Sequence, residues 1–127
     1  MNPSLKNRWL TASFSPEDGG LRRLSSVGGP NLVARSSLRS YDAAARLWRS
    51  DDPALPGERF SLQSLVAGKE TVTVVSRSAD LETTIEWHLP PQSPLLRARV
   101  RVRGLGSGAK LGFLAMPRIA LARGFND

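Results

Sequence analysis

Four arginines occupy alternate positions of one short segment, at Arg97, Arg99, Arg101 and Arg103. In an extended strand, side chains two residues apart point to the same face and lie about 6.6 Å from one another. The planar guanidinium group binds carboxylates and phosphates through paired hydrogen bonds. The spacing therefore predicts a basic strip that could bind a polyanion, either an acidic glycan or a nucleic acid.

A hairpin between residues 80–89 and 96–103 explains the same arginines without a ligand. Each pair of opposite charges facing across two strands contributes roughly 0.2–1 kcal/mol and opposes slippage of the register. We favour this paired interpretation because it uses the alternation of both strands, and a polyanion-binding role of the whole row stays open as the alternative. The opposed residues would be Leu89 with Leu96, His88 with Arg97, Glu86 with Arg99, Thr84 with Arg101 and Glu82 with Arg103.

Glu86 and His88 share one face of the first of these strands and could act as a general acid and base. A surface histidine beside an arginine is the more common arrangement, so we expect no catalytic residue here. With one histidine and no cysteine, only scattered carboxylates could hold a metal ion. The sequence thus predicts neither a metal site nor a cofactor.

Three aromatic residues are further candidates for ligand binding. Trp9 lies on the polar face of its strand, and Tyr41 and Trp48 lie near several arginines in an irregular region. Flat aromatic faces beside hydrogen-bonding groups suit sugar rings or bases. Packing within the protein is the more common role of tryptophan, and both interpretations stay open.

The elements that would position these residues are strands, because apolar residues recur at every second position in short runs bounded by Gly, Pro, Ser and Asp. We expect an all-β fold, an antiparallel β-sandwich of about seven strands formed as one domain by residues 1–127. Residues 35–58 are predicted to form an irregular loop that contains a brief helix from Asp42 to Trp48. The runs cover residues 8–14, 21–27, 32–34, 60–62, 70–77, 80–89, 96–103 and 111–119.

Composition narrows the partners that the chain could have. Arginine supplies 15 of the 18 basic residues, and the net charge is +7, which favours association with polyanions. No run approaches the ~18 apolar residues of a membrane helix, and the first residues lack the apolar core of a secretory signal. We therefore expect a soluble protein without a membrane partner, and a cytoplasmic location by default.

Two segments resemble the β-sandwich domains of carbohydrate-active enzymes, namely the galactose-mutarotase-like supersandwich and the C-terminal β-domains of family 38 α-mannosidases. They are RWLTASFSPEDGGLRRLSSVGGPNLV, residues 8–33, and DLETTIEWHLPPQSPLLRARVRV, residues 80–102. The resemblance covers about a third of the chain and consists of patterns of sheet construction. The histidines and glutamate of an active mutarotase have no counterparts at matching positions, and such sandwiches are usually longer. It therefore implies an incomplete or reduced sandwich.

We accordingly expect a non-catalytic module of a glycoside-hydrolase-type protein, which acts as a scaffold or binds sugar. The alternative is a polyanion-binding domain that uses the arginine-lined face. An independent enzyme that uses Glu86 and His88 is a third and less favoured class. Open sheet edges would also allow contact with a further domain or with a second copy of the chain.

Overall fold

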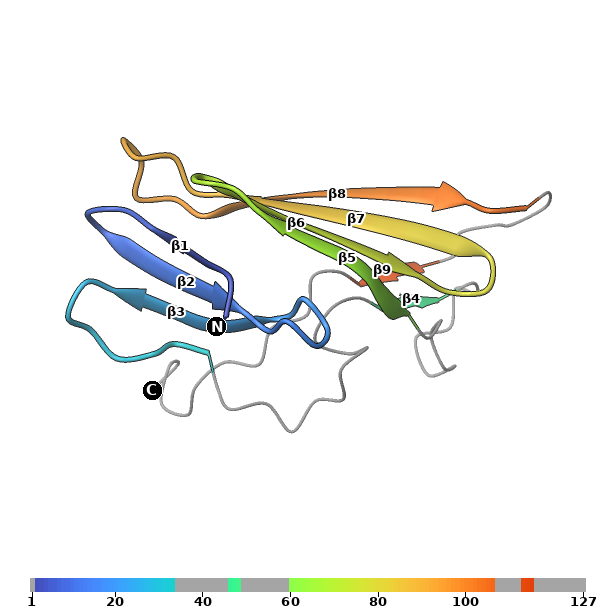
Figure 1. Ribbon diagram of the computed structural model, residues 1–127, viewed down its shortest axis with the longest axis horizontal. Coiled ribbons are helices and arrows are strands. Elements are labelled where there is room, and N and C mark those ends of the chain that lie inside the picture. The colour runs from blue at the N-terminus through green and yellow to red at the C-terminus, as the bar shows by residue number, and fades with distance from the viewer. Residues whose placement is uncertain (1, 34–45, 49–59, 107–112, 116–127) are drawn as a thin grey trace.

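Two antiparallel sheets face one another in the computed structural model, which describes residues 2–33, 46–48, 60–106 and 113–115 (Figure 1). One sheet has three strands in the order β1-β2-β3, and the other has four in the order β5-β6-β7-β8. The prediction of an all-β, antiparallel sandwich is confirmed, with seven strands in these two layers. Strands β4 and β9 form a separate antiparallel pair. The strands are β1 Ser4–Lys6, β2 Leu10–Phe14, β3 Leu21–Ser26, β4 Arg46–Trp48, β5 Ser61–Ala67, β6 Thr71–Arg77, β7 Leu81–His88, β8 Arg97–Gly104 and β9 Phe113–Ala115.

Alternating burial along the central strands shows why these segments become strands. In β6 and β7 every second side chain is buried, and the residues between them are only partly covered. Because side chains of a strand alternate between faces, this sequence buries one face of the sheet and leaves the other for solvent. The register places Val72 beside Trp87 and Val74 beside Ile85 on the buried face.

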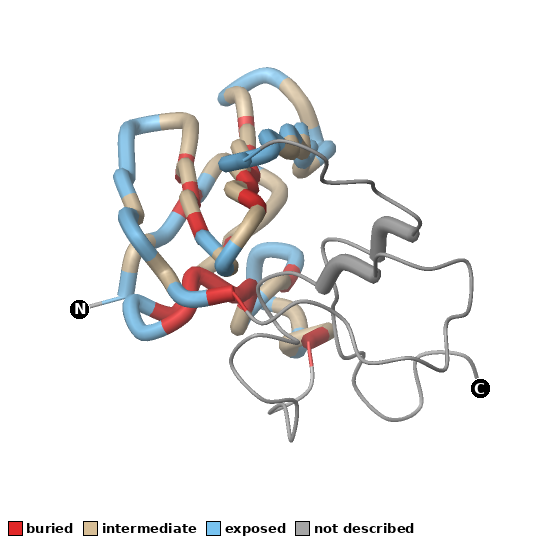
Figure 2. The backbone as a smooth tube through the Cα atoms, turned by 90° about the vertical axis from the view of Figure 1, so that its right-hand side faces the viewer, coloured by how far each residue is buried: buried red, intermediate tan, exposed pale blue. Residues whose placement is uncertain are grey.

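The core lies between the two layers, where Figure 2 shows the buried residues gathered. Phe14 of the three-stranded sheet meets Trp87 of the four-stranded sheet with ring centroids 5.4 Å apart and planes tilted by 51°. Such tilted aromatic pairs add stability beyond the burial of their surface. Leu5 packs in the same cluster and is almost completely buried.

A second link between the layers is the turn that connects β2 and β3. Gly19 in this turn has a φ of +75°, and an added Cβ would lie 2.4 Å from Val74 Cγ1 of the opposite sheet. Only glycine tolerates both this backbone conformation and so close an approach. The turn is therefore seated against β6.

The side chain of Asn7 joins the β1–β2 hairpin to the turn that follows β7. Its Oδ1 accepts hydrogen bonds from the backbone N–H groups of Trp9 and Leu10, each at 2.9 Å. Its Nδ2 donates to the carbonyl oxygens of Pro90, at 2.9 Å, and Ser93, at 2.7 Å. One residue thus binds backbone groups in two separate parts of the fold.

The prediction of a helix from Asp42 to Trp48 is wrong for the three of these residues that the structure describes. Residues Arg46–Trp48 form β4, which pairs with Phe113–Ala115. Pairing with a strand distant in the sequence has overridden a weak local helix propensity. The rest of the predicted helix, and most of the irregular region 35–58, lie outside the described residues.

One predicted inward position also differs. Leu96, Val100 and Val102 pack against the core as expected, whereas Ala98 is exposed. Strand β8 is the last strand of its sheet, so the opposite layer covers it less well than it covers β6 and β7. The small side chain of alanine does not reach far enough to be covered there.

Candidate anion-binding face

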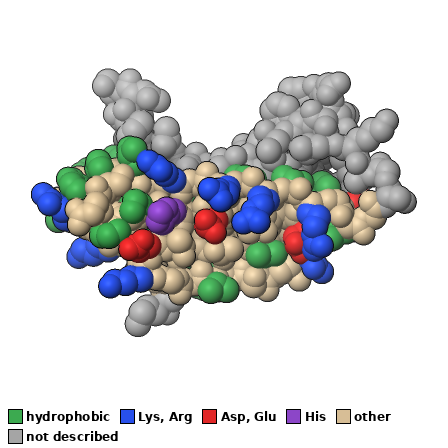
Figure 3. Space-filling view, turned by 90° about the horizontal axis from the view of Figure 1, so that it is seen from above, with side chains coloured by type: hydrophobic (Ala, Val, Ile, Leu, Met, Phe, Trp, Pro, Cys, Tyr) green, Lys and Arg blue, Asp and Glu red, His purple; other side chains and the backbone are tan. Residues whose placement is uncertain are grey.

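The four arginines of β8 lie on the face of the four-stranded sheet that points away from the core. Strand β8 pairs with β7 in the predicted register, which places Glu86 opposite Arg99 and Glu82 opposite Arg103. The alternation of the sequence produces this arrangement, because Val100 and Val102, which lie between arginines, pack inward. Seen from above, basic side chains form a row along this face (Figure 3).

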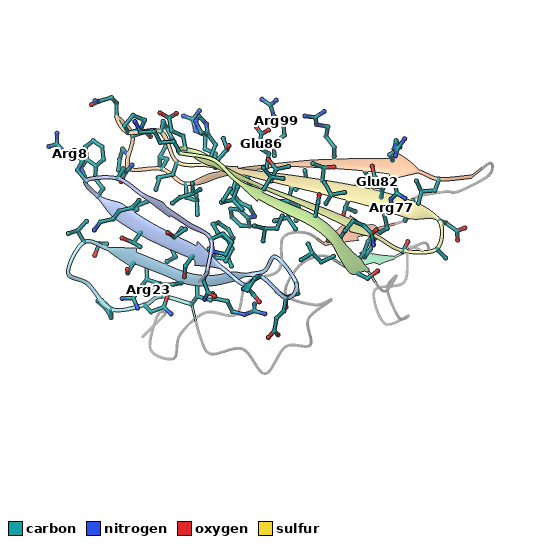
Figure 4. The ribbon with its side chains drawn as sticks, viewed as in Figure 1. Arg8, Arg23, Arg77, Glu82, Glu86 and Arg99 are labelled. Atoms are coloured by element: carbon teal, nitrogen blue, oxygen red, sulfur yellow. The ribbon has the colours of Figure 1, made fainter. Side chains whose placement is uncertain are left out.

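One end of the row is neutralised by the sheet itself. Glu82 Oε1 accepts a hydrogen bond from Arg103 Nη2 at 3.0 Å, and Glu82 Oε2 accepts one from Arg77 Nε at 2.7 Å. The hydrogen bond from Arg77, aided by that from Arg103, holds the pKa of Glu82 below its ordinary value of 4.5. Figure 4 shows Arg77 and Glu82 together at this end of the sheet. The paired interpretation is therefore confirmed here.

The remaining three arginines form no such pair. Arg97, Arg99 and Arg101 are exposed and make no ion pair with any residue in the described ranges. Glu86 faces Arg99 and points to the same side of the sheet (Figure 4), but no ion pair joins them. We call these three residues the arginine strip. With side chains repeating every ~6.8 Å along an extended chain, the strip spans about 14 Å.

A shallow depression lies at one end of the arginine strip. It has a volume of about 220 Å³ and is lined by Glu86, His88, Arg97, Ala98 and Arg99. The carboxylate of Glu70 lies next to His88, with Oε2 3.6 Å from His88 Nε2. The depression thus combines two guanidinium groups with a carboxylate and an imidazole.

The part of β5 and β6 that lies beside the arginine strip carries no charged side chain on this face. Strands β5 and β6 contribute Ser64, Val66, Thr73 and Val75 at positions aligned with the strip. Within the described part of this face no Phe, Tyr or Trp is present, and the imidazole of His88 is the one ring there. Single-stranded nucleic acids are commonly bound by several bases that stack on successive aromatic rings. The chemistry of this face is that of ionic and hydroxyl contacts.

Of the aromatic candidates, the structure places the side chain of Trp9 alone, and it lies away from the arginine strip. Trp9 precedes β2 on the other sheet, and the guanidinium carbon of Arg8 lies 4.6 Å from the centroid of its ring. This cation–π contact already covers one face of the indole. Tyr41 lies outside the described residues, and Trp48 belongs to β4, where the description does not extend to its side chain.

Two contributors to this face were missed at the level of sequence. Arg77 shares Glu82 with Arg103, and Glu70 contacts His88. The hairpin between residues 71–77 and 81–88 could have revealed Arg77, because its register sets Arg77 opposite Glu82. Glu70 lies just before β6 and has no signal in the period-two pattern.

Other ionisable groups of the described region serve the fold. Asp18 is buried, and its carboxylate accepts hydrogen bonds from the backbone N–H of Gly20 and from Arg22 Nη2. It therefore caps the β2–β3 turn and forms an ion pair with Arg22. Within the described ranges, no three acidic or histidine side chains come together as metal ligands, and no helix could span a membrane.

Comparisons with protein-family models, with curated proteins and with solved structures found no match to this chain. The fold and the face described above therefore define it as an all-β sandwich with a basic strip on one outer face.

Proposed function

We propose that this protein is a non-catalytic β-sandwich that binds an acidic polysaccharide along the arginine strip. The observation that carries the proposal is that the four arginines of β8 differ in their ionic partners. Arg103 is neutralised by Glu82, whereas Arg97, Arg99 and Arg101 stand exposed without an ion pair in the described residues. Guanidinium groups in this state are available for carboxylate or sulfate groups.

A sugar polymer is favoured over a nucleic acid for two reasons. The neighbouring half of the face offers hydroxyl groups and small apolar side chains, and its described residues include no ring on which a base could stack. The two segments that resemble sandwich domains of carbohydrate-active enzymes also support a sugar ligand. A scaffold role within a larger glycoside-hydrolase-type protein is compatible with the same strip, since it would place the sandwich beside an acidic glycan.

The test is the salt dependence of binding to heparin, a sulfated polysaccharide. Neutralising one charge of a nucleic acid changes the slope of log K against log salt by about 0.7 to 0.9, and we take this range for the polysaccharide. Three arginines then give a slope of about −2.1 to −2.7, which corresponds to a roughly 20- to 40-fold loss of affinity between 50 and 200 mM salt. Calorimetry at these two concentrations measures the loss.

Single substitutions locate the binding face. Arg99→Gln should reduce the steepness of the slope by about one. Arg23→Gln is the matched control, since Arg23 is also exposed and makes no ion pair with a described residue but lies on the other sheet (Figure 4). Equal effects of the two substitutions would show that net charge, and not the strip, causes binding. Stronger binding of single-stranded DNA than of heparin by the unsubstituted protein would instead support the nucleic-acid alternative.

A further inference from the structure

We infer that Glu86 makes the depression selective for acidic units that carry hydroxyl groups, such as uronic acids, over polyanions that offer only acceptor oxygens. This inference rests on the proposed function and names the chemical class of unit that the strip accepts at this point. It follows from the position of one carboxylate among cationic side chains.

Glu86 lines the depression together with Arg97 and Arg99. Arg99 lies directly across from it in the register, and His88 follows two residues later on the same face of β7. The carboxylate of Glu86 makes no hydrogen bond or ion pair with a described residue, so it remains available to a ligand. Glu82, on the same strand, instead bonds two arginines.

An ionised carboxylate only accepts hydrogen bonds, whereas a guanidinium group only donates them. A ligand that satisfies the whole depression must therefore present an anionic group to Arg97 and Arg99 and a donor to Glu86. A uronic acid residue carries both a carboxylate and hydroxyl groups. Inorganic polyphosphate carries acceptor oxygens alone within its chain, so it would leave Glu86 unpaired and repelled.

The size of the depression agrees with a single unit of a polymer. Sites for whole small-molecule ligands usually have volumes of roughly 300–1,000 Å³, whereas this depression has about 220 Å³. The strip beyond it, at Arg101, would hold the following part of the chain. The depression would thus contribute selectivity, and the strip would contribute most of the ionic attraction.

The experiment compares the affinities for polygalacturonate and polyphosphate at one salt concentration. Glu86→Gln keeps the shape of the side chain, removes its charge and adds donors. We expect it to strengthen polyphosphate binding about fivefold or more and to change polygalacturonate binding little, because a lost charge-assisted bond offsets the lost repulsion. The ratio of the two dissociation constants should shift accordingly. Glu86→Ala also removes the contact to the sugar hydroxyl, so it should weaken polygalacturonate binding while the lost repulsion still strengthens polyphosphate binding.

Glu17→Gln is the control for net charge, since Glu17 is exposed in the turn after β2. This substitution should leave the ratio unchanged. Equal strengthening of both polymers by Glu86→Gln would overturn the role of Glu86 while leaving the proposed function intact. Absence of salt-dependent polygalacturonate and heparin binding by the unsubstituted protein would overturn the proposed function, and this inference with it.

Discussion

Replacing Gly19 by alanine should destabilise the fold for two reasons, a strained backbone and a steric clash with the opposite sheet. A second glycine allows these two contributions to the free energy of unfolding to be separated. A non-glycine residue in the left-handed region costs about 1–2 kcal/mol. The new Cβ would also lie 2.4 Å from Val74 Cγ1, which is buried in the core. Overpacking of this kind typically costs about 1–3 kcal/mol. We therefore expect Gly19→Ala to lower the free energy of unfolding by about 2–5 kcal/mol.

Gly28 provides the matched control. Its φ is +78°, close to that of Gly19, but an added Cβ would meet nothing within 4 Å. Gly28→Ala should therefore show only the backbone cost of about 1–2 kcal/mol. Urea unfolding followed by tryptophan fluorescence, to which the buried Trp87 contributes, measures both variants. Equal destabilisation by the two substitutions would refute the seating of the β2–β3 turn against β6.

Two further predictions concern the ends of the four-stranded sheet. Because the pKa of Glu82 is lowered in the folded state, its contribution to stability is complete above the ordinary value of 4.5 and disappears as the pH falls through the depressed pKa. Urea unfolding between neutral pH and about pH 3 should show a smaller loss for Glu82→Gln than for the unsubstituted protein, and identical losses would contradict this. Asn7→Ala should lower the unfolding free energy by about 1–3 kcal/mol, because backbone groups near both hairpins lose their partners. Asn7→Asp retains the acceptor and removes both donors to Pro90 and Ser93, so a variant as stable as the unsubstituted protein would exclude the link between the hairpins.

The architecture was predictable where burial alternates with a period of two residues. The register of β7 with β8 followed from the apolar and charged positions of both strands, and the structure has the same pairs, from His88 with Arg97 to Glu82 with Arg103. A shift of one residue would have exposed the apolar face of each strand. An alternating pattern indicates both that a segment is a strand and how two strands pair. The sequence alone was therefore sufficient to predict this hairpin.

Features that depend on contacts between distant segments were not predictable. The pairing of β4 with β9 joins residues almost 70 positions apart, and no local signal outweighed the helix propensity before Trp48. Asn7 looks like an ordinary polar residue until the turn at residues 90–93 is placed beside it. Likewise, the exposure of Ala98 depends on β8 being the last strand of its sheet. Each of these outcomes depends on how the strands are arranged in space. The residue pattern of a single strand carries no information on that arrangement.

Ion pairing within the sheet does not account for the arginine strip. Strand β6 shows that threonine and valine serve at the corresponding outward positions, since Thr71, Thr73 and Val75 lie on the same face. Arginines about 6.8 Å apart in one strand are closer than the screening length of about 8 Å at physiological salt, so they repel one another. Among the described residues, an acidic partner removes this repulsion only at Arg103, where Glu82 is bonded. A ligand with regularly spaced anionic groups would remove it along the rest of the strip, which supports the proposed binding role.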